Sequence, residues 1–350
     1  TPHLQVVVRV LLDVPQPVPA DLLVAAHPRA GGREVPALLF AREQDSSVSF
    51  HPARDVALDA AARLGRLVAD PALRTRADER AHDRAGTRAP AAASLAAGDL
   101  GVMLVLHELA DVVEEDRALL ERAALGIALA QREADHDELS MITGSTGALA
   151  ALADAWRVHG RRDLREAAED LRDRVVDDVL LSPPPSFAAG CSMDDYDLIS
   201  GAAGQLVALV HAHAVLPAHD GTLSALSVLR DHLHAAIEPA AIDPRLPACW
   251  IAPEYYGLES RDEMPRGYVN LGLAHGVPGI LHALAVTALR TPLEVDVAAV
   301  DFATGVQLRH RGADPYSWGT AQPVGPPDDH VARNTAAPWS SGPPDWAPPP

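Results

Sequence analysis

Four short glycine turns constrain the fold of this chain more than any other feature. Each turn reads Gly-x-x-Gly and runs into an apolar segment with helical spacing. The turns are 98–101, 144–147, 201–204 and 276–279, and the apolar segments are 102–109, 148–156, 205–214 and 280–289. Paired glycines allow sharp turns and let the starts of helices approach one another closely. The pattern predicts a repeat protein; the alternative is four ordinary turns at helix starts.

A second set of helices is predicted between the apolar ones. These segments carry more charge and are amphipathic: 119–132, 164–181, 223–237 and 295–309. An apolar helix after each glycine pair, followed by an amphipathic helix, predicts an inner layer covered by an outer one. The expected fold is therefore mainly α, an α/α toroid made of a double ring of helices, complete or incomplete.

The two ends of the chain differ from this pattern. Residues 1–54 contain β-branched, partly alternating segments such as Leu4–Val14 and are predicted to form a small β-containing appendage. The toroid is assigned to residues 55–312, and its first helix is expected at Val56–Val68. Residues 313–350 hold ten prolines without apolar periodicity, which predicts a disordered or loosely packed tail.

The charge of the chain restricts its partners. With 29 basic and 48 acidic residues the formal net charge is −19, and every basic residue is arginine. This charge argues against nucleic acid or an anionic membrane as the partner. No apolar run reaches the length of a membrane helix, and the first residues lack a signal-peptide pattern. We expect a cytoplasmic protein.

The candidate chemistry centres on His275, which lies in the last glycine turn before an apolar helix. The positive end of a helix dipole favours neutral imidazole, and a neighbouring carboxylate such as Asp197 would restore the charged form. From the residues alone, His275 could equally be a packing or capping residue, and Asp197 a structural hydrogen-bond acceptor. Four further histidines on predicted helices are interpreted as residues at the edge of the core: His107, His211, His213 and His282.

Two motifs carry a resemblance to a known family. Tyr196-Asp-Leu-Ile-Ser-Gly-Ala-Ala-Gly204 and Asn270-Leu-Gly-Leu-Ala-His-Gly-Val-Pro-Gly279 resemble signature motifs of the lanthionine synthetase C-like (LanC) family, over roughly residues 55–310. The resemblance implies a double ring of helices and a lanthionine cyclase. In such an enzyme a peptide cysteine adds to dehydroalanine or dehydrobutyrine and closes a thioether ring. It also implies His275 and Asp197 as catalytic residues, a dehydrated precursor peptide as substrate and a dehydratase as partner.

The zinc centre that this resemblance implies has no ligands in the sequence. Its ligands come from two cysteine motifs after Ala-His-Gly, whereas no cysteine follows Cys249 here. Trp339 and Gly342 match the first of these motifs without its thiol. Cys191 and Cys249 form neither a disulfide framework nor a metal motif. Three explanations stay open: a truncated or frame-disrupted cyclase, a zinc-free cyclase, or an inactive relative that serves as a peptide-binding scaffold.

A glycosidase on the same kind of toroid is a further alternative. It needs two carboxylates across a cleft, for which Asp194 with Glu254 or Glu259 are candidates. No aromatic platform for a sugar is evident, which disfavours this hypothesis.

Overall fold

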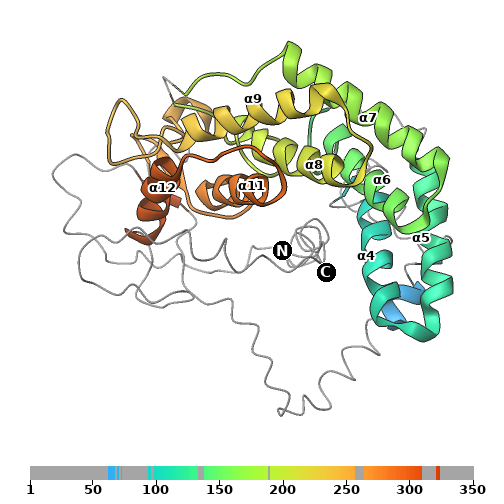
Figure 1. Cartoon of the computed structure of the whole chain (residues 1–350). Coiled ribbons are helices and arrows are strands. Elements are labelled where there is room, and N and C mark those ends of the chain that lie inside the picture. Colours follow the sequence, from blue (N-terminus) through green and yellow to red (C-terminus); the bar gives the residue numbers. More distant parts are fainter. Residues whose placement is uncertain are drawn as a thin grey trace, which may run out of the picture.

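A computed structural model describes residues 98–132, 138–187, 190–256, 264–309 and 321–323, with short stretches between 62 and 95. In these residues the chain is almost entirely helical, and the helices form a curved arc of two layers (Figure 1). The predicted appendage at residues 1–54 lies outside the described residues. The same holds for the predicted tail apart from residues 321–323.

The concave side of the arc consists of helices that each begin directly after the first glycine of a turn. They are α4 (Asp99–Val112), α6 (Ser145–His159), α8 (Ala202–Val215) and α11 (Val277–Arg290), with N-caps at Gly98, Gly144, Gly201 and Gly276. Every residue of α6 from Ser145 to Ala155 is buried. These helices are buried on more than one face, as their apolar sequences predicted.

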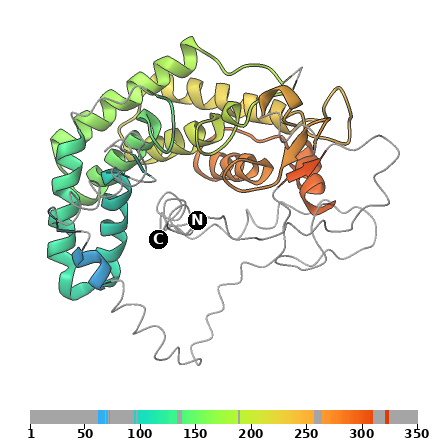
Figure 2. The ribbon, with the colours of Figure 1, turned by 180° about the vertical axis from the view of Figure 1, so that it is seen from behind.

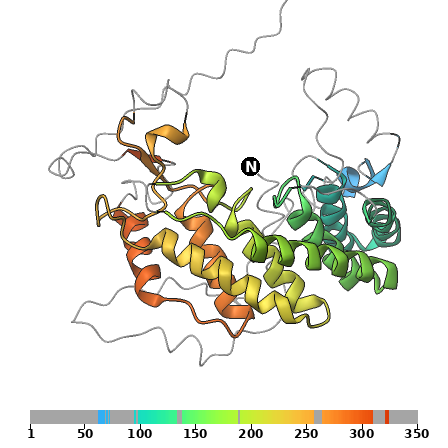
Figure 3. The same ribbon diagram turned by 90° about the horizontal axis from the view of Figure 1, so that it is seen from above.

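The convex side carries the amphipathic helices. They are α5 (Arg117–Gln131), α7 (Arg162–Leu181), α9 (Asp220–Ile237) and α12 (Val297–Arg309). Helix α7 buries a single stripe of residues and turns its charged face outward. The two-layer arrangement is the same from behind (Figure 2), and from above α7 and α9 follow one another along one side of the arc (Figure 3). The predicted alternation of inner and outer helices is confirmed for these eight.

Short elements connect the helices. Three are 3-10 turns: η1 (Glu114–Asp116), η2 (Met193–Asp195) and η3 (Pro253–Tyr255). Strand β1 (Tyr268–Asn270) pairs in antiparallel register with β2 (Ala321–Pro323). None of the described helices is long and apolar enough to cross a bilayer.

Backbone hydrogen bonds join each glycine turn to the next one. The donor is always the backbone amide three residues before the first glycine of a turn. The acceptor is the backbone carbonyl two residues before the first glycine of the next turn. The bonds are Leu95 N to Ile142 O at 2.7 Å, Met141 N to Ile199 O at 2.9 Å and Leu198 N to Ala274 O at 3.0 Å. The starts of the four inner helices are therefore neighbours along the arc.

The turns require glycine for steric reasons rather than for unusual dihedral angles. A Cβ at Gly144 would lie 1.8 Å from the carbonyl oxygen of Glu138, and one at Gly276 would lie 2.3 Å from that of Asn270. The φ angles of these residues, −123° and −140°, are open to any residue. Close backbone approach thus explains the paired glycines.

The helix predicted at Val56–Val68 is described only in part, and its packing differs from the expectation. Residues 62–67 are helical, but Leu64 and Leu67 are 54% and 56% exposed. Gly65 lies against the core instead, where a Cβ would be 3.1 Å from side-chain atoms of Leu109 and Leu120. The helix approaches its neighbours through a small residue, so its leucine pattern identified the wrong face.

Candidate functional site

The structure brings together the two residues that the sequence selected. Nδ1 of His275 lies 2.5 Å from Oδ2 of Asp197, although 78 residues separate them. They belong to consecutive glycine turns, and the bond from Leu198 N to Ala274 O holds these turns together beside the pair. The site is therefore a direct product of how successive turns are stacked.

Asp197 is fully buried and its carboxylate is fixed by its own turn. Oδ1 accepts hydrogen bonds from three backbone amides: those of Ile199 at 2.9 Å, Ser200 at 2.7 Å and Gly201 at 3.0 Å. Oδ2 remains for the imidazole of His275. One oxygen therefore holds the turn in shape while the other orients the histidine.

A neighbouring turn shows what this position does without a charge. Ser140 lies four residues before its glycine, as Asp197 does before Gly201, and its Oγ accepts from the amides of Ile142 and Thr143 at 3.1 and 3.2 Å. A hydroxyl can therefore cap the turn by itself. The carboxylate of Asp197 adds a second acceptor. Comparing the repeats position by position could have predicted that one oxygen of Asp197 caps the turn while the other is available to a partner.

His275 is placed so that one face of its ring can meet another molecule. Its carbonyl oxygen accepts from the hydroxyl of Tyr196 at 3.2 Å, and 45% of its side chain is exposed. With Nδ1 engaged by the carboxylate, Nε2 points away from Asp197. Such a pair can donate a proton from Nε2 when the ring is charged and accept one when it is neutral.

Both motif loops are anchored to the same small group of extended segments. Ile251 forms isolated bridges with Cys191 on one side and Tyr268 on the other. The thioether of Met193 accepts from the hydroxyl of Tyr268 at 3.7 Å and from the side-chain amide Nδ2 of Asn270 at 3.4 Å. The segment before Asp197 and the strand before His275 thus hold each other in place.

The described residues do not fit the zinc centre that the family resemblance implies. Cys191 and Cys249 are 2% and 1% exposed. Burial raises the pKa of Cys249 to about 12 and that of Cys191 further still, so both thiols stay protonated near neutral pH. Within the part of the chain that the structure describes, no three His, Cys, Asp or Glu side chains converge on a possible metal position.

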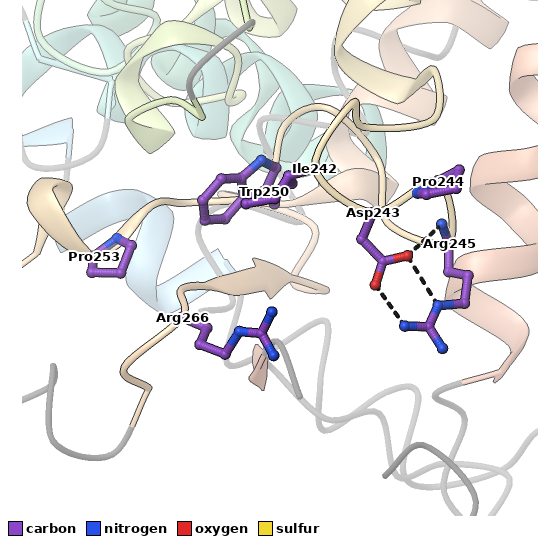
Figure 4. Close-up of a pocket in the computed structure, with 7 residues that line it drawn as sticks. All are labelled: Ile242, Asp243, Pro244, Arg245, Trp250, Pro253 and Arg266. Atoms are coloured by element: carbon purple, nitrogen blue, oxygen red, sulfur yellow. Dashed lines mark hydrogen bonds and ion pairs between the residues drawn. The ribbon is translucent and has the colours of Figure 1, made fainter. Parts of the chain in front are cut away.

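A cavity of about 450 Å³ opens beside Trp250 (Figure 4). It is lined by Ile242, Asp243, Pro244, Arg245, Trp250, Pro253 and Arg266. Arg245 folds back onto Asp243, donating from Nε at 2.9 Å and from Nη2 at 2.8 Å. The carboxylate thus offsets the charge of this guanidinium, and the cavity offers a hydrophobic wall with a polar rim.

The other residues singled out in the sequence occupy different places. His107 and His211 are buried rather than lying at the edge of the core, and His107 bonds to Asp154 and His159. His213 and His282 are partly exposed. The glycosidase candidates Asp194 and Glu254 are exposed, and Glu259 lies outside the described residues.

A family model described as "Lanthionine synthetase C-like protein" matches residues 89–344, which is most of the chain. The chain belongs to the lanthionine synthetase C-like family. The match extends past residue 310 into the Pro-rich segment that contains Trp339 and Gly342. The resemblance stated from the two motifs is confirmed.

Among solved structures, this LanC-like chain is similar to one named nisin cyclase, with a TM-score of 0.53 and 16% sequence identity. The alignment covers 72% of this chain and 61% of nisin cyclase, so the chain spans less than two thirds of that protein. At this identity the likeness supports the mainly helical, toroid-like fold. No curated protein sequence matches the chain.

Proposed function

We propose that this LanC-like chain binds a dehydrated peptide and closes thioether rings in it, with His275 and Asp197 as its proton-transfer pair. The observation that carries the proposal is the 2.5 Å contact between His275 Nδ1 and the buried carboxylate of Asp197. Membership of the family supports a peptide as the substrate. A cytoplasmic location and a dehydratase partner stay predictions.

The reaction joins a peptide cysteine to a dehydroalanine or dehydrobutyrine of the same peptide. The sulfur forms a bond to the β-carbon, the carbon–carbon double bond opens, and the resulting enolate takes a proton at the α-carbon. A free thiol has a pKa of about 8.5, so only a minor fraction is ionised at pH 7.5. Neutral His275 can accept the thiol proton at Nε2 and then deliver it to the α-carbon, which balances the reaction.

Asp197 acts through the histidine. It holds Nδ1 of His275 protonated and keeps Nε2 aimed at the substrate, while its negative charge stabilises the imidazolium that forms between the two proton transfers. The three amides on Oδ1 keep the carboxylate still during this cycle. Positioned acid–base groups of this kind contribute about 10²–10⁴-fold to a rate.

Zinc is a typical cofactor of the family. The two buried, protonated thiols do not fit such a centre. The proposal therefore rests on the histidine and the aspartate of this chain.

The test is an assay on a synthetic peptide that contains one cysteine and one dehydroalanine. Free thiol is followed with a chromogenic reagent, and the thioether product by loss of alkylation in mass spectrometry. We expect His275→Ala and Asp197→Asn to lower the rate of thiol loss at least about tenfold. His213 lies on α8 and is not part of the pair formed by His275 and Asp197, so His213→Ala should lose thiol at the same rate as the unmodified chain. Equal rates with and without protein would refute the proposal.

An inactive peptide-binding scaffold is the second candidate. Two observations favour it: the described residues do not fit a zinc centre, and a cavity lies beside Trp250. The intact pair of Asp197 and His275 counts against it. Binding of the same peptide, measured by fluorescence anisotropy, with no thiol loss would support the scaffold, provided that Trp250→Ala weakens binding and His275→Ala does not.

A further inference from the structure

A second histidine cluster lies at the opposite end of the inner helices. Nε2 of His107 on α4 is 3.1 Å from Nε2 of His159, the last residue of α6. The glycine turns hold the starts of these helices together, and 15 helical residues place His159 about 20 Å from them. The cluster is therefore separate from the pair formed by Asp197 and His275.

A buried carboxylate fixes the orientation of one of these rings. Nδ1 of His107 lies 2.9 Å from Oδ2 of Asp154, which is fully buried. Arg157 donates to Oδ1 of Asp154 from Nε at 3.0 Å and from Nη2 at 2.6 Å. With Nδ1 of His107 against this carboxylate, Nε2 of the same ring faces His159.

Two imidazole nitrogens this close need something between them. One arrangement is a hydrogen bond from His159 in its Nε2–H form. The other is a shared metal ion: with Zn–N bonds of about 2.0–2.1 Å and tetrahedral angles, two ligand nitrogens lie roughly 3.3 Å apart. A carboxylate on the second nitrogen of a ligand histidine is the usual support for such a ligand. The observed 3.1 Å requires only a small opening of the pair.

Solvent can reach one side of this cluster. His159 is partly exposed, so water can reach the side of the ring that faces solvent.

We propose that His107 and His159 form a transition-metal site, preferring Zn²⁺, Ni²⁺ or Cu²⁺, which ties α4 to α6 at the end of the arc away from His275. Imidazole nitrogen is a favoured ligand of all three ions. The structure shows no third protein ligand among the described residues, so water completes the coordination. The bound ion would stabilise the contact between these two neighbouring repeats.

Calorimetric titration of the metal-free chain with zinc chloride tests the proposal. We expect one saturable site per chain and a higher melting temperature with zinc. His159→Ala should weaken zinc binding at least about tenfold, and Asp154→Asn about 10–100-fold through loss of the support on His107. Circular dichroism checks that each variant is folded.

His275→Ala is the matched control, because it removes a histidine of the other site. It should leave the zinc affinity unchanged. The proposal is overturned if the chain shows no saturable binding, or if binding is the same in His159→Ala. It is equally overturned if His275→Ala abolishes binding, since the ion would then lie at the pair with Asp197.

Discussion

Replacing Gly201 by alanine should destabilise the protein through the turn that holds Asp197. A Cβ at this position would lie 2.3 Å from the backbone nitrogen of Asp197, and 2.5 and 2.6 Å from N and C of Tyr196. All three are backbone atoms, so no side chain can rotate away. The φ of Gly201 is −96°, and the cost is therefore steric and not conformational.

The size of the effect follows from two contributions. Overpacking of this kind costs about 1–3 kcal/mol. Shifting the turn also weakens the amide bonds to Oδ1 of Asp197, each worth about 1 kcal/mol. We expect the free energy of unfolding to fall by about 2–4 kcal/mol, and for a domain of this size each kcal/mol lowers the melting temperature by roughly 2–4 °C.

Gly126→Ala provides the matched control in urea denaturation. Gly126 is exposed in the middle of α5 and a Cβ there would meet nothing within 4 Å. Alanine should stabilise this helix by about 0.5–1 kcal/mol, because it restricts the unfolded chain and favours helix. Replacing glycine by alanine should thus lower the free energy of unfolding at Gly201 and raise it at Gly126. A Gly201→Ala variant within about 0.5 kcal/mol of the unmodified chain would refute the steric reasoning.

Three further outcomes follow from the same structure. Asp197→Ala should destabilise the chain by about 2 kcal/mol more than Asp197→Asn in urea denaturation, because only asparagine keeps an acceptor for the buried amides; equal values would contradict this. Burial lowers the pKa of His211 and His232 from 6.5, so the unfolded chain binds more protons below that pH. The stability that these two neutral histidines contribute should therefore be present above about pH 6.5 and be lost as the pH falls below that value, so that the free energy of unfolding decreases toward pH 5; a flat profile would contradict the assignment. Cys191 and Cys249 should resist a thiol reagent in the folded protein and both react in guanidinium, which a spectrophotometric count of reacted thiols checks.

The helical architecture was predictable because it depends on local patterns. Glycine pairs mark the helix starts, and apolar or amphipathic spacing separates inner from outer helices. The exposed Leu64 and Leu67 show where this reasoning fails. Periodicity gives the apolar face of a helix, but it does not reveal that Gly65 allows closer packing on the other side.

The histidine cluster was not predictable for a different reason. His107 and Asp154 are 47 residues apart on two helices, and each alone resembles an ordinary polar residue in an apolar run. Only the packing of α4 against α6 shows that they meet. By contrast, Asp197 and His275 could be selected because they lie in recognisable turns, although their contact also required the fold.

The repeated turns lead to a final prediction about how the pair arises. Ser140 lies four residues before its glycine, as Asp197 does in the next turn, and Ser200 lies directly before its glycine, as His275 does. The two junctions also share a backbone bond: Met141 N donates to Ile199 O, and Leu198 N donates to Ala274 O. The geometry for a second pair therefore exists one junction earlier. Ser140→Asp alone loses the 3.1 Å bond from Ser140 Oγ to Ile199 O and should be destabilising.

Adding Ser200→His to that variant should recover part of the loss. The new imidazole can donate to the new carboxylate across the same kind of junction, and groups in direct contact typically show coupling energies of 0.5–3 kcal/mol. A double-mutant cycle in urea measures this coupling. Strict additivity of the two substitutions would show that the turn junction does not by itself align such a pair, and that the 2.5 Å contact of His275 with Asp197 depends on local features such as Tyr196 and its bond to the His275 carbonyl.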